Sequence, residues 1–432
     1  MLLNKKTSFN KFLKTITVLL FAVWIIYPLE TKAQRLSGLQ QILDSIEIAN
    51  PTVRMYNAQI RSLNETAKGA KAWMAPELNS GFFMTPYNPS LWRKGSDGTP
   101  GMGQYLVAVQ QTIPNRSRLN AEYQYMSTMS TVEREQKGAE LNNLYAQGKT
   151  AYYEWAIMKK KLSVLDQNEI VLNFMIKNAE IRYKNGLGKI SAYYKAKASL
   201  GSLYSMRLML QNEIKQRRIL LNTLKNTLDK NAEFDIDTSY TIKDYPTPLF
   251  DTASLISNRN DIRAIERQVD LTFLQQNLER ARLKPEFGIR YEHMFGFGGA
   301  PNLYTLMGMV RLPFARWSAR MNRANIEGLK WKAQSLGAQK QMLVNEYTGM
   351  AFRTKSEIDL KKKQIELYEN NIIPALRRNY QSMQLGYEQN TEELFELYDA
   401  WETLNMTQLD YLDQLQQLLT MQAELEKILQ IK

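Results

Sequence analysis

The chain has 432 residues, with 56 Lys and Arg against 43 Asp and Glu, one histidine and no cysteine. Without cysteine there are no disulfides, thiolate metal ligands or cysteine nucleophiles. A single histidine, His293, cannot build a histidine-rich zinc site. The mean hydropathy of −0.42 excludes a polytopic helical membrane protein. The length fits two or three domains, or one elongated object.

Residues 1–33 have the pattern of a secretory signal peptide. Four lysines precede an apolar stretch, 16–27, and Ala33 is a small residue suited to cleavage. Pro28 and Glu30 end the apolar stretch short of the roughly 20 residues that a membrane-spanning helix needs. We therefore expect an exported protein. Its positive charge is spread along the chain, which argues against a nucleic-acid partner.

The remaining sequence consists of two copies of one plan. "KAWMAPEL", ending at Leu78, recurs as "RARLKPEF", ending at Phe287, and the two prolines are 209 positions apart. Each motif precedes an aromatic region rich in Gly and Pro, a very long helix-forming stretch, a turn and a second helical stretch. A period near 205 residues excludes a solenoid, whose repeats have about 20–50. We expect a first repeat over 34–228, an equatorial linker over 229–250 and a second repeat over 251–432.

Each aromatic region predicts a β-hairpin, near 77–113 and near 286–312. From Phe287 to Phe297, apolar residues alternate with polar or small ones, which is the period of a β-strand. Strands of about 10 residues with aromatic ends are typical of transmembrane β-barrels; an ordinary soluble hairpin is the alternative. Because two hairpins supply only four strands and open edges cannot lie in lipid, several chains would have to share one barrel.

The helix-forming stretches predict long rods. The stretch 117–183 has no proline and only two glycines, so it can form a helix of roughly 100 Å. Its counterpart, 317–384, contains Pro374, which should kink it near its end. Shorter helices, 52–75 and 191–228 in one copy and 260–283 and 391–429 in the other, can stack end to end beside the long ones. Such rods favour the wall of a water-filled tube, with a soluble periplasmic coiled-coil scaffold as the alternative.

These landmarks resemble the TolC-like outer membrane efflux proteins over about 390 residues. The matching elements are "LQQILDSIEIANPTVR", the exits at Pro114 and Pro313, and the turns in "RYKNGLGKISAYYKAKASL" and "GYEQNTEELFELYDA". The resemblance implies a mainly α fold with a membrane β part. In such a homotrimer, four strands per chain form a shared 12-stranded barrel in the outer membrane, above a periplasmic α-helical barrel.

The resemblance also implies contacts with a periplasmic adaptor protein at the helical tips. The matching residues are Asn185, Gly186, Leu187 and Gly188 in the first repeat, and Gly386, Tyr387 and Asn390 in the second. The alternative is that the glycines serve only to allow a positive φ between antiparallel helices. Both roles are compatible in one tip.

A periplasmic gate is the second site that the resemblance implies. Glu396 and Asp399 match the family's carboxylate pair and, three residues apart, lie on one helix face. Three copies would place six carboxylates around a narrow opening, where they would favour cations. A solvated helix face is the alternative. Glu396 is one carbon longer than the family's usual aspartate, and Lys195 stands at the equivalent of Asp399 in the first repeat, so ion selectivity could differ.

The expected function is a passive exit duct for an inner-membrane pump of the resistance–nodulation–division type. The second hairpin is similar to the heavy-metal branch, and Met294, Met307 and Met309 offer soft thioether ligands, although methionine is also an ordinary packing residue. Heavy-metal cations or drugs are the expected substrates, and type I protein secretion is the alternative. His293 has no nucleophile motif beside it, so we expect no enzyme, no cofactor and no bound metal.

Overall fold

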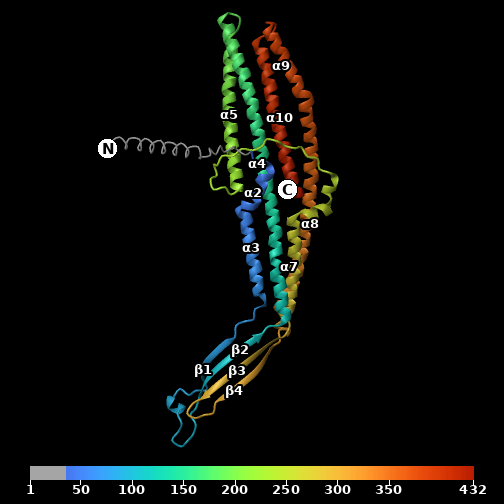
Figure 1. Cartoon of the computed structure of the whole chain (residues 1–432). Helices are drawn as coiled ribbons and strands as arrows, with labels where there is room; N and C mark the ends of the chain where they lie inside the picture. Colours follow the sequence, from blue (N-terminus) through green and yellow to red (C-terminus); the bar gives the residue numbers. More distant parts are fainter. Residues whose placement is uncertain (1–35) are drawn as a thin grey trace, which may run out of the picture.

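The computed structural model describes residues 36–432, so the predicted signal peptide lies outside the described residues. The molecule is a long rod with the helices at one end and a four-stranded sheet at the other (Figure 1). Among residues 36–432, the structure contains no helix that is both long and apolar enough to span a membrane.

The two repeats follow the same order of elements, except that the long helix of the second repeat is divided into α8 and α9. The first comprises α2 (Leu39–Ala49), α3 (Pro51–Lys68), β1 (Glu77–Phe83), β2 (Gln104–Ile113), α4 (Arg116–Lys184) and α5 (Ile190–Leu224). The second comprises α6 (Thr252–Asn258), α7 (Asn260–Arg282), β3 (Glu286–Gly296), β4 (Leu303–Arg311), α8 (Arg320–Leu367), α9 (Ile373–Glu388) and α10 (Leu394–Leu429). The predicted mainly α fold with two hairpins is thus confirmed.

Helix α4 is the central strut of the rod, in contact with α3, α5, α7 and α10. It begins where the Asn115 side chain accepts a hydrogen bond from the Ser117 backbone N–H at 2.8 Å, which caps the helix. No proline interrupts its 69 residues. In the second repeat, a π-helical turn, Tyr368–Ile372, separates α8 from α9 directly before Pro374. Proline lacks a backbone N–H, which explains the expected interruption at this place.

The waist of the rod holds the main hydrophobic core. Tyr152 and Trp155 of α4 pack there with residues of α5 and α10 and with Ile236 of the irregular segment between α5 and α6. Within this core, Lys149 and Glu426 form an ion pair at 3% and 2% side-chain exposure. Because a buried charge is costly without a partner, this pair fixes α4 against α10.

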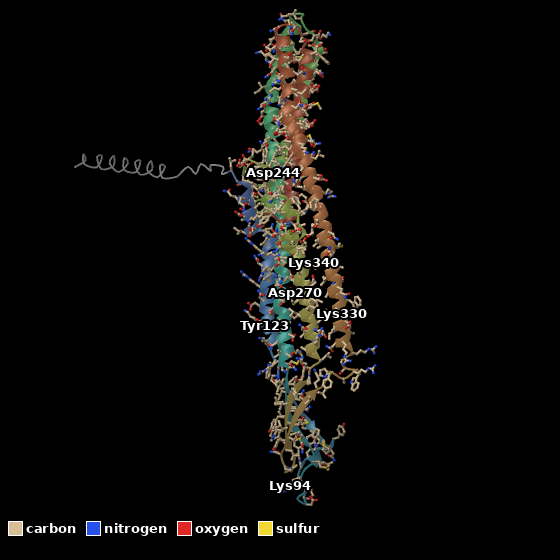
Figure 2. All side chains as sticks on the ribbon, turned by 90° about the vertical axis from the view of Figure 1, so that its right-hand side faces the viewer. Lys94, Tyr123, Asp244, Asp270, Lys330 and Lys340 are labelled. Atoms are coloured by element: carbon tan, nitrogen blue, oxygen red, sulfur yellow. The ribbon has the colours of Figure 1, made fainter. Side chains whose placement is uncertain are left out.

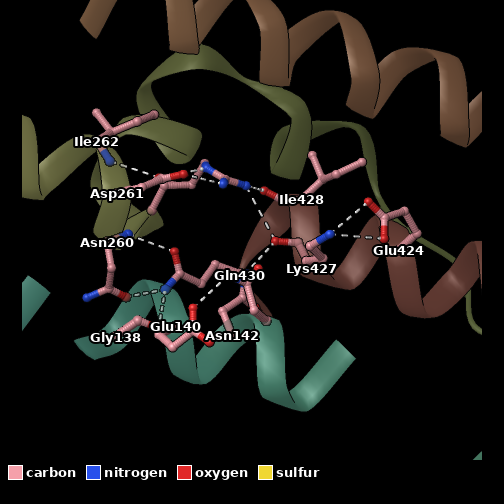
Figure 3. Close-up of polar contacts among 12 residues, drawn as sticks. Gly138, Glu140, Asn142, Asn260, Asp261, Ile262, Glu424, Lys427, Ile428 and Gln430 are labelled. Atoms are coloured by element: carbon pink, nitrogen blue, oxygen red, sulfur yellow. Dashed lines mark hydrogen bonds and ion pairs between the residues drawn. The ribbon is translucent and has the colours of Figure 1, made fainter. Parts of the chain in front are cut away.

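Polar contacts also attach the end of α10 to both repeats (Figure 3). The Gln430 side chain accepts a hydrogen bond from the Asn260 backbone N–H at 2.7 Å, and Arg259 donates to the Ile428 carbonyl. Asn142 of α4 donates to the Lys427 carbonyl at 2.8 Å. The two repeats therefore meet at the waist through specific bonds as well as apolar packing.

The two hairpins form one antiparallel sheet in the order β1-β2-β3-β4. Strands β2 and β3, from different repeats, pair over ten residues from Gln104↔Gly296 to Ile113↔Phe287. Strand β1 has only seven residues, shorter than the expected ten, because Met84 adopts a positive φ of 47° and Pro86 follows it. Among residues 36–432, β1 and β4 each pair with only one strand and so have one unpaired edge.

Candidate functional site

One face of the sheet is apolar. The strand register places Leu78, Val109, Tyr291 and Leu306 in one row across all four strands, and each is at least 42% exposed. Neighbouring rows on this face add Phe82, Phe287, Phe295, Tyr304 and Val310. An exposed apolar face of this extent is typical of a surface that meets lipid or another protein.

The opposite face is polar and more enclosed. A row on this face contains Asn79, Ala108, Glu292 and Thr305, of which Ala108 is fully buried and Glu292 is 7% exposed. Glu292 forms an ion pair with Arg290 on the same strand. This alternation, apolar on one face and polar on the other, is that of a barrel strand with lipid outside and water inside.

The three barrel methionines lie on the polar face. Met307 is paired with Arg290, Met309 with Gly288, and Met294 with Leu303. A Cβ on Gly288 would lie 2.9 Å from the methyl carbon of Met309, so that methionine packs over the glycine. Among residues 36–432, no group of three or more His, Asp or Glu residues is arranged to hold a metal ion.

The first helical tip joins α4 to α5. Gly186 has a φ of +72°, and the Leu187 N–H donates to the Arg182 carbonyl at 2.8 Å, which is the Schellman ending of a helix. No atom lies within 4 Å of a Cβ placed on Gly186, so its backbone angle, rather than crowding, favours glycine. Leu187 is 72% exposed at the end of the rod.

The second tip, between α9 and α10, repeats this geometry with asparagine. Asn390 has a φ of 60°, and the Thr391 N–H donates to the Gly386 carbonyl at 2.9 Å. Tyr387 is only 5% exposed: its ring belongs to the hydrophobic cluster between the helices, and Arg182 of the first tip lies over it. Arg182 also donates a hydrogen bond to the Asn390 side-chain oxygen. The two tips of one chain therefore form a single unit.

Glu396 and Asp399 lie near the start of α10, and both are exposed. Glu396 takes part in a capping box: its carboxylate accepts a hydrogen bond from the Glu393 backbone N–H at 3.0 Å. A hydrogen bond with Glu396, together with its negative charge, raises the pKa of Glu392. The structure thus gives Glu396 a local role in addition to any role at a gate.

The first repeat places a cation against this acidic turn. The Lys195 ammonium lies 4.0 Å from the ring centroid of Phe395 and 4.1 Å from that of Tyr398. Phe395 and Tyr398 are the immediate neighbours of the two predicted gate carboxylates. Sequence reasoning placed Lys195 at the position equivalent to Asp399 but gave no sign of its stacking on α10, because that contact joins residues about 200 positions apart.

Comparisons with known proteins agree with this architecture. Residues 42–227 match the outer membrane efflux protein family. The fold is similar to that of CusC, described as forming a transmembrane channel, with a TM-score of 0.72 and 15% identity over 90% of this chain and 91% of that chain. For VceC from Vibrio cholerae the TM-score is 0.70, with 16% identity over 90% and 95% of the two chains. For the MtrE outer membrane channel from Neisseria gonorrhoeae it is 0.68, with 15% identity over 90% and 88%. No curated protein matches the sequence.

An amphipathic sheet that continues into long helical rods is the fold that this chain shares with these solved structures. The match to the outer membrane efflux protein family covers the first repeat, residues 42–227, and the likeness to the solved structures extends over both repeats. The matching family is described as outer membrane efflux proteins, and the CusC structure as that of a transmembrane channel.

Proposed function

We propose that three copies of the chain form the exit duct of a tripartite efflux system. The observation that carries the proposal is the amphipathic sheet with two unpaired edges, β1 and β4. Such edges are not tolerated in lipid, and pairing β1 of one copy with β4 of the next closes the sheet. Three copies would then give about 12 strands, within the range of known membrane barrels.

The helical end of the duct would receive a periplasmic adaptor protein. The exposed tip residues Leu187 and Gly188 and the polar second turn, Gly386 to Asn390, support this docking. The adaptor would in turn join the duct to an inner-membrane pump of the resistance–nodulation–division type. Transport through the duct is passive, and the pump supplies the energy and most of the selectivity.

The polar face of the sheet would line the barrel. It combines ionic groups, such as Arg290 and Glu292, with methionines, so it suits a passage for small polar solutes or cations. Heavy-metal cations and drugs are the proposed substrates. A soluble coiled-coil scaffold, by contrast, would leave the apolar face of the sheet exposed to water at a considerable free-energy cost.

Conductance of the purified mature chain in a planar bilayer tests the proposal. The protein should be extracted from outer membranes only with detergent, run as a trimer and give stable, cation-selective channels of low conductance. A rod that is soluble without detergent and gives no current would overturn the proposal. The kind of partner is tested by deleting the gene for this protein. If the partner is an efflux pump, the deletion should sensitise cells to metals or drugs. If a secreted protein disappears from the medium instead, type I secretion is favoured.

A further inference from the structure

The connection between the sheet and the helices differs between the two repeats. In the first repeat, α4 begins at Arg116, two residues after Pro114; in the second, α8 begins at Arg320, seven residues after Pro313. The added residues lie in the segment 311–323, "RLPFARWSARMNR", which we call the basic linker. It contains four arginines and no acidic residue.

The apolar side chains of the basic linker are uncovered. Trp317 is 84% exposed, Met321 71% and Phe314 52%. Trp317 thus has almost no packing partner within its own chain. Exposed aromatic residues next to membrane strands are typical of the headgroup region, where the ring is partly buried and its polar edge remains hydrated.

Three of the four arginines of the basic linker are also unpaired. Arg316, Arg320 and Arg323 are exposed, and none of them forms an ion pair with any residue in 36–432. In the first repeat, by contrast, Arg118 forms an ion pair with Glu286, whose carboxylate compensates the positive charge of Arg118. Glu286 also lies 3.4 Å from Arg311. Three guanidinium groups thus remain available for an anion.

The linker begins at the end of the sheet that faces the helices. Strand β4 ends at Arg311, and Leu312 follows Val310 at the two-residue spacing of the apolar face, both more than half exposed. The first turns of α8, below Lys330 in Figure 2, leave the sheet at this junction. With the sheet in the outer membrane, as proposed above, the linker would lie at the periplasmic rim of the membrane part, level with lipid headgroups; this inference rests on that part of the proposed function.

We propose that the basic linker binds anionic phospholipids at the periplasmic surface of the outer membrane. Arg316, Arg320 and Arg323 would bind headgroup phosphates, to which guanidinium groups can donate two parallel hydrogen bonds. Phe314 and Trp317 would enter the interface between headgroups and acyl chains. This surface goes beyond the proposed export function, since it anchors the channel in its membrane whatever passes through it.

Charge complementarity favours lipid over a second copy of the chain as the occupant. The opposite edge of a neighbouring copy would present the end of α3 and the residues after it, where Lys68 and Lys71 are exposed. The carboxylate of Glu65 is already paired with Lys68. Glu77 at the start of β1 is exposed as well, so this edge carries as many acidic as basic side chains and offers no net opposite charge to three unpaired arginines, whereas a surface of anionic lipid does.

The test uses the absence of cysteine from the chain. Ser318 is exposed in the middle of the basic linker, so Ser318→Cys gives one labelling site for an environment-sensitive fluorophore. The labelled trimer is reconstituted in phosphatidylcholine vesicles that contain headgroup-spin-labelled phosphatidylglycerol or, separately, headgroup-spin-labelled phosphatidylcholine. We expect spin-labelled phosphatidylglycerol to quench the fluorophore at a mole fraction at least about fivefold lower than spin-labelled phosphatidylcholine does. About fivefold corresponds to the roughly 1 kcal/mol that one basic residue contributes near an anionic surface.

The arginine variant and its control decide the cause. Arg316→Gln with Arg320→Gln and Arg323→Gln should abolish the preference for phosphatidylglycerol. Arg54→Gln with Arg61→Gln and Lys215→Gln removes the same charge from exposed positions on α3 and α5 and should leave the preference unchanged. The triple Arg→Lys variant of the linker should retain most of the preference, which provides a readout if the glutamine variant fails to assemble as a trimer.

Two results would overturn the proposal. Equal quenching by both lipids, in a trimer that conducts normally, would show that the linker has no preference for anionic headgroups. A fluorophore shielded from both lipids and from iodide in water would place the linker in a protein interface. Either result leaves the channel function intact, so failure of this proposal is distinguishable from failure of the proposed function.

Discussion

Arg182, at the end of α4, lies over the ring of Tyr387, at the end of α9, with 4.5 Å between the guanidinium carbon and the ring centroid. This contact, together with the hydrogen bond from Arg182 to Asn390, joins the two tips of one chain. If the tips form the rim of the periplasmic opening, moving them apart would widen that opening. In that case, the contact between Arg182 and Tyr387 would couple the local structure of the two turns to the conductance of the channel.

The first prediction concerns this contact. Arg182→Ala should raise the fraction of time for which a single channel in a planar bilayer is open, and with it the time-averaged conductance. An exposed cation–π contact contributes about 0.5–1 kcal/mol, so its loss alone should raise the open fraction about two- to fivefold, and loss of the hydrogen bond, about 0.5–1.5 kcal/mol, should add a further factor of about two to ten. Lys177→Ala, which removes a positive charge from an exposed position on the same helix, should behave like the wild type. If the control gives the same increase, net charge rather than the contact is responsible.

The second prediction concerns adaptor docking. Leu187 at the first tip and Ile170 on the body of α4 are both 72% exposed, so Glu at either position should leave folding almost unchanged. Leu187→Glu should weaken adaptor binding by about tenfold or more if the tip is the contact, and Ile170→Glu should not. Co-purification of the adaptor after chemical cross-linking measures this difference. Equal loss in the two variants would remove the tip from the interface.

The third prediction concerns the acidic turn. Glu396→Gln with Asp399→Asn should raise single-channel conductance and reduce cation preference, because a carboxylate ring at a constriction attracts cations. Amides retain the shape of the side chains, so most of the capping geometry of Glu396 remains. Asp410→Asn, further along α10 and also exposed, is the control. Unchanged current in the double variant would place the gate elsewhere.

The fourth prediction is a pH dependence of the second tip. The hydrogen bond and charge of Glu396 raise the pKa of Glu392. A carboxyl group with a raised pKa in the folded state stabilises that state below its unfolded pKa, and this contribution is lost as the pH rises through the folded value. The tip should therefore exchange its amide hydrogens more slowly, after correction for intrinsic rates, at about pH 4 than at about pH 7. Glu392→Gln should remove most of this difference; an unchanged difference would mean that another group is responsible.

The fifth prediction concerns the buried ion pair at the waist. Lys149→Met removes one partner of the Glu426 carboxylate, whose side chain is 2% exposed. The free energy of unfolding should therefore fall by about 3–5 kcal/mol. Adding Glu426→Gln should recover a large part of this loss, although Lys243 then loses its own contact with that carboxylate. Denaturation of the detergent-purified protein measures both variants. A double variant as unstable as the single one would contradict the electrostatic explanation.

The sequence predicts those features whose signal is local. The absence of proline between Arg116 and Lys184 is enough to predict α4, and the two-residue alternation after Phe287 predicts β3 together with the polarity of its faces. The duplication then predicts the first hairpin, where the alternation is less clear, from the second. Pro374 likewise predicts an interruption in the second long helix, because its effect on the backbone does not depend on tertiary contacts.

Other features depend on contacts between distant residues and leave no local signal. The pairing of β2 with β3 joins residues about 180 positions apart, and no spacing in the sequence indicates it. Lys149 resembles any helical lysine in the sequence, yet it is buried against Glu426. Tyr387 has the pattern of an exposed turn residue, but Arg182 from the other repeat covers it.

The central claim is that β1 and β4 of successive copies close one barrel, and disulfide cross-linking tests it most directly. Because the chain has no cysteine, a cysteine at Ser80 of β1 combined with one at successive positions of β4, from Leu303 to Arg311, forms bonds only between these engineered sites. We predict that one register gives covalent dimers and trimers in the outer membrane and that the ladder stops at three. A ladder that stops at two, continues beyond three or never forms in any register would contradict the account.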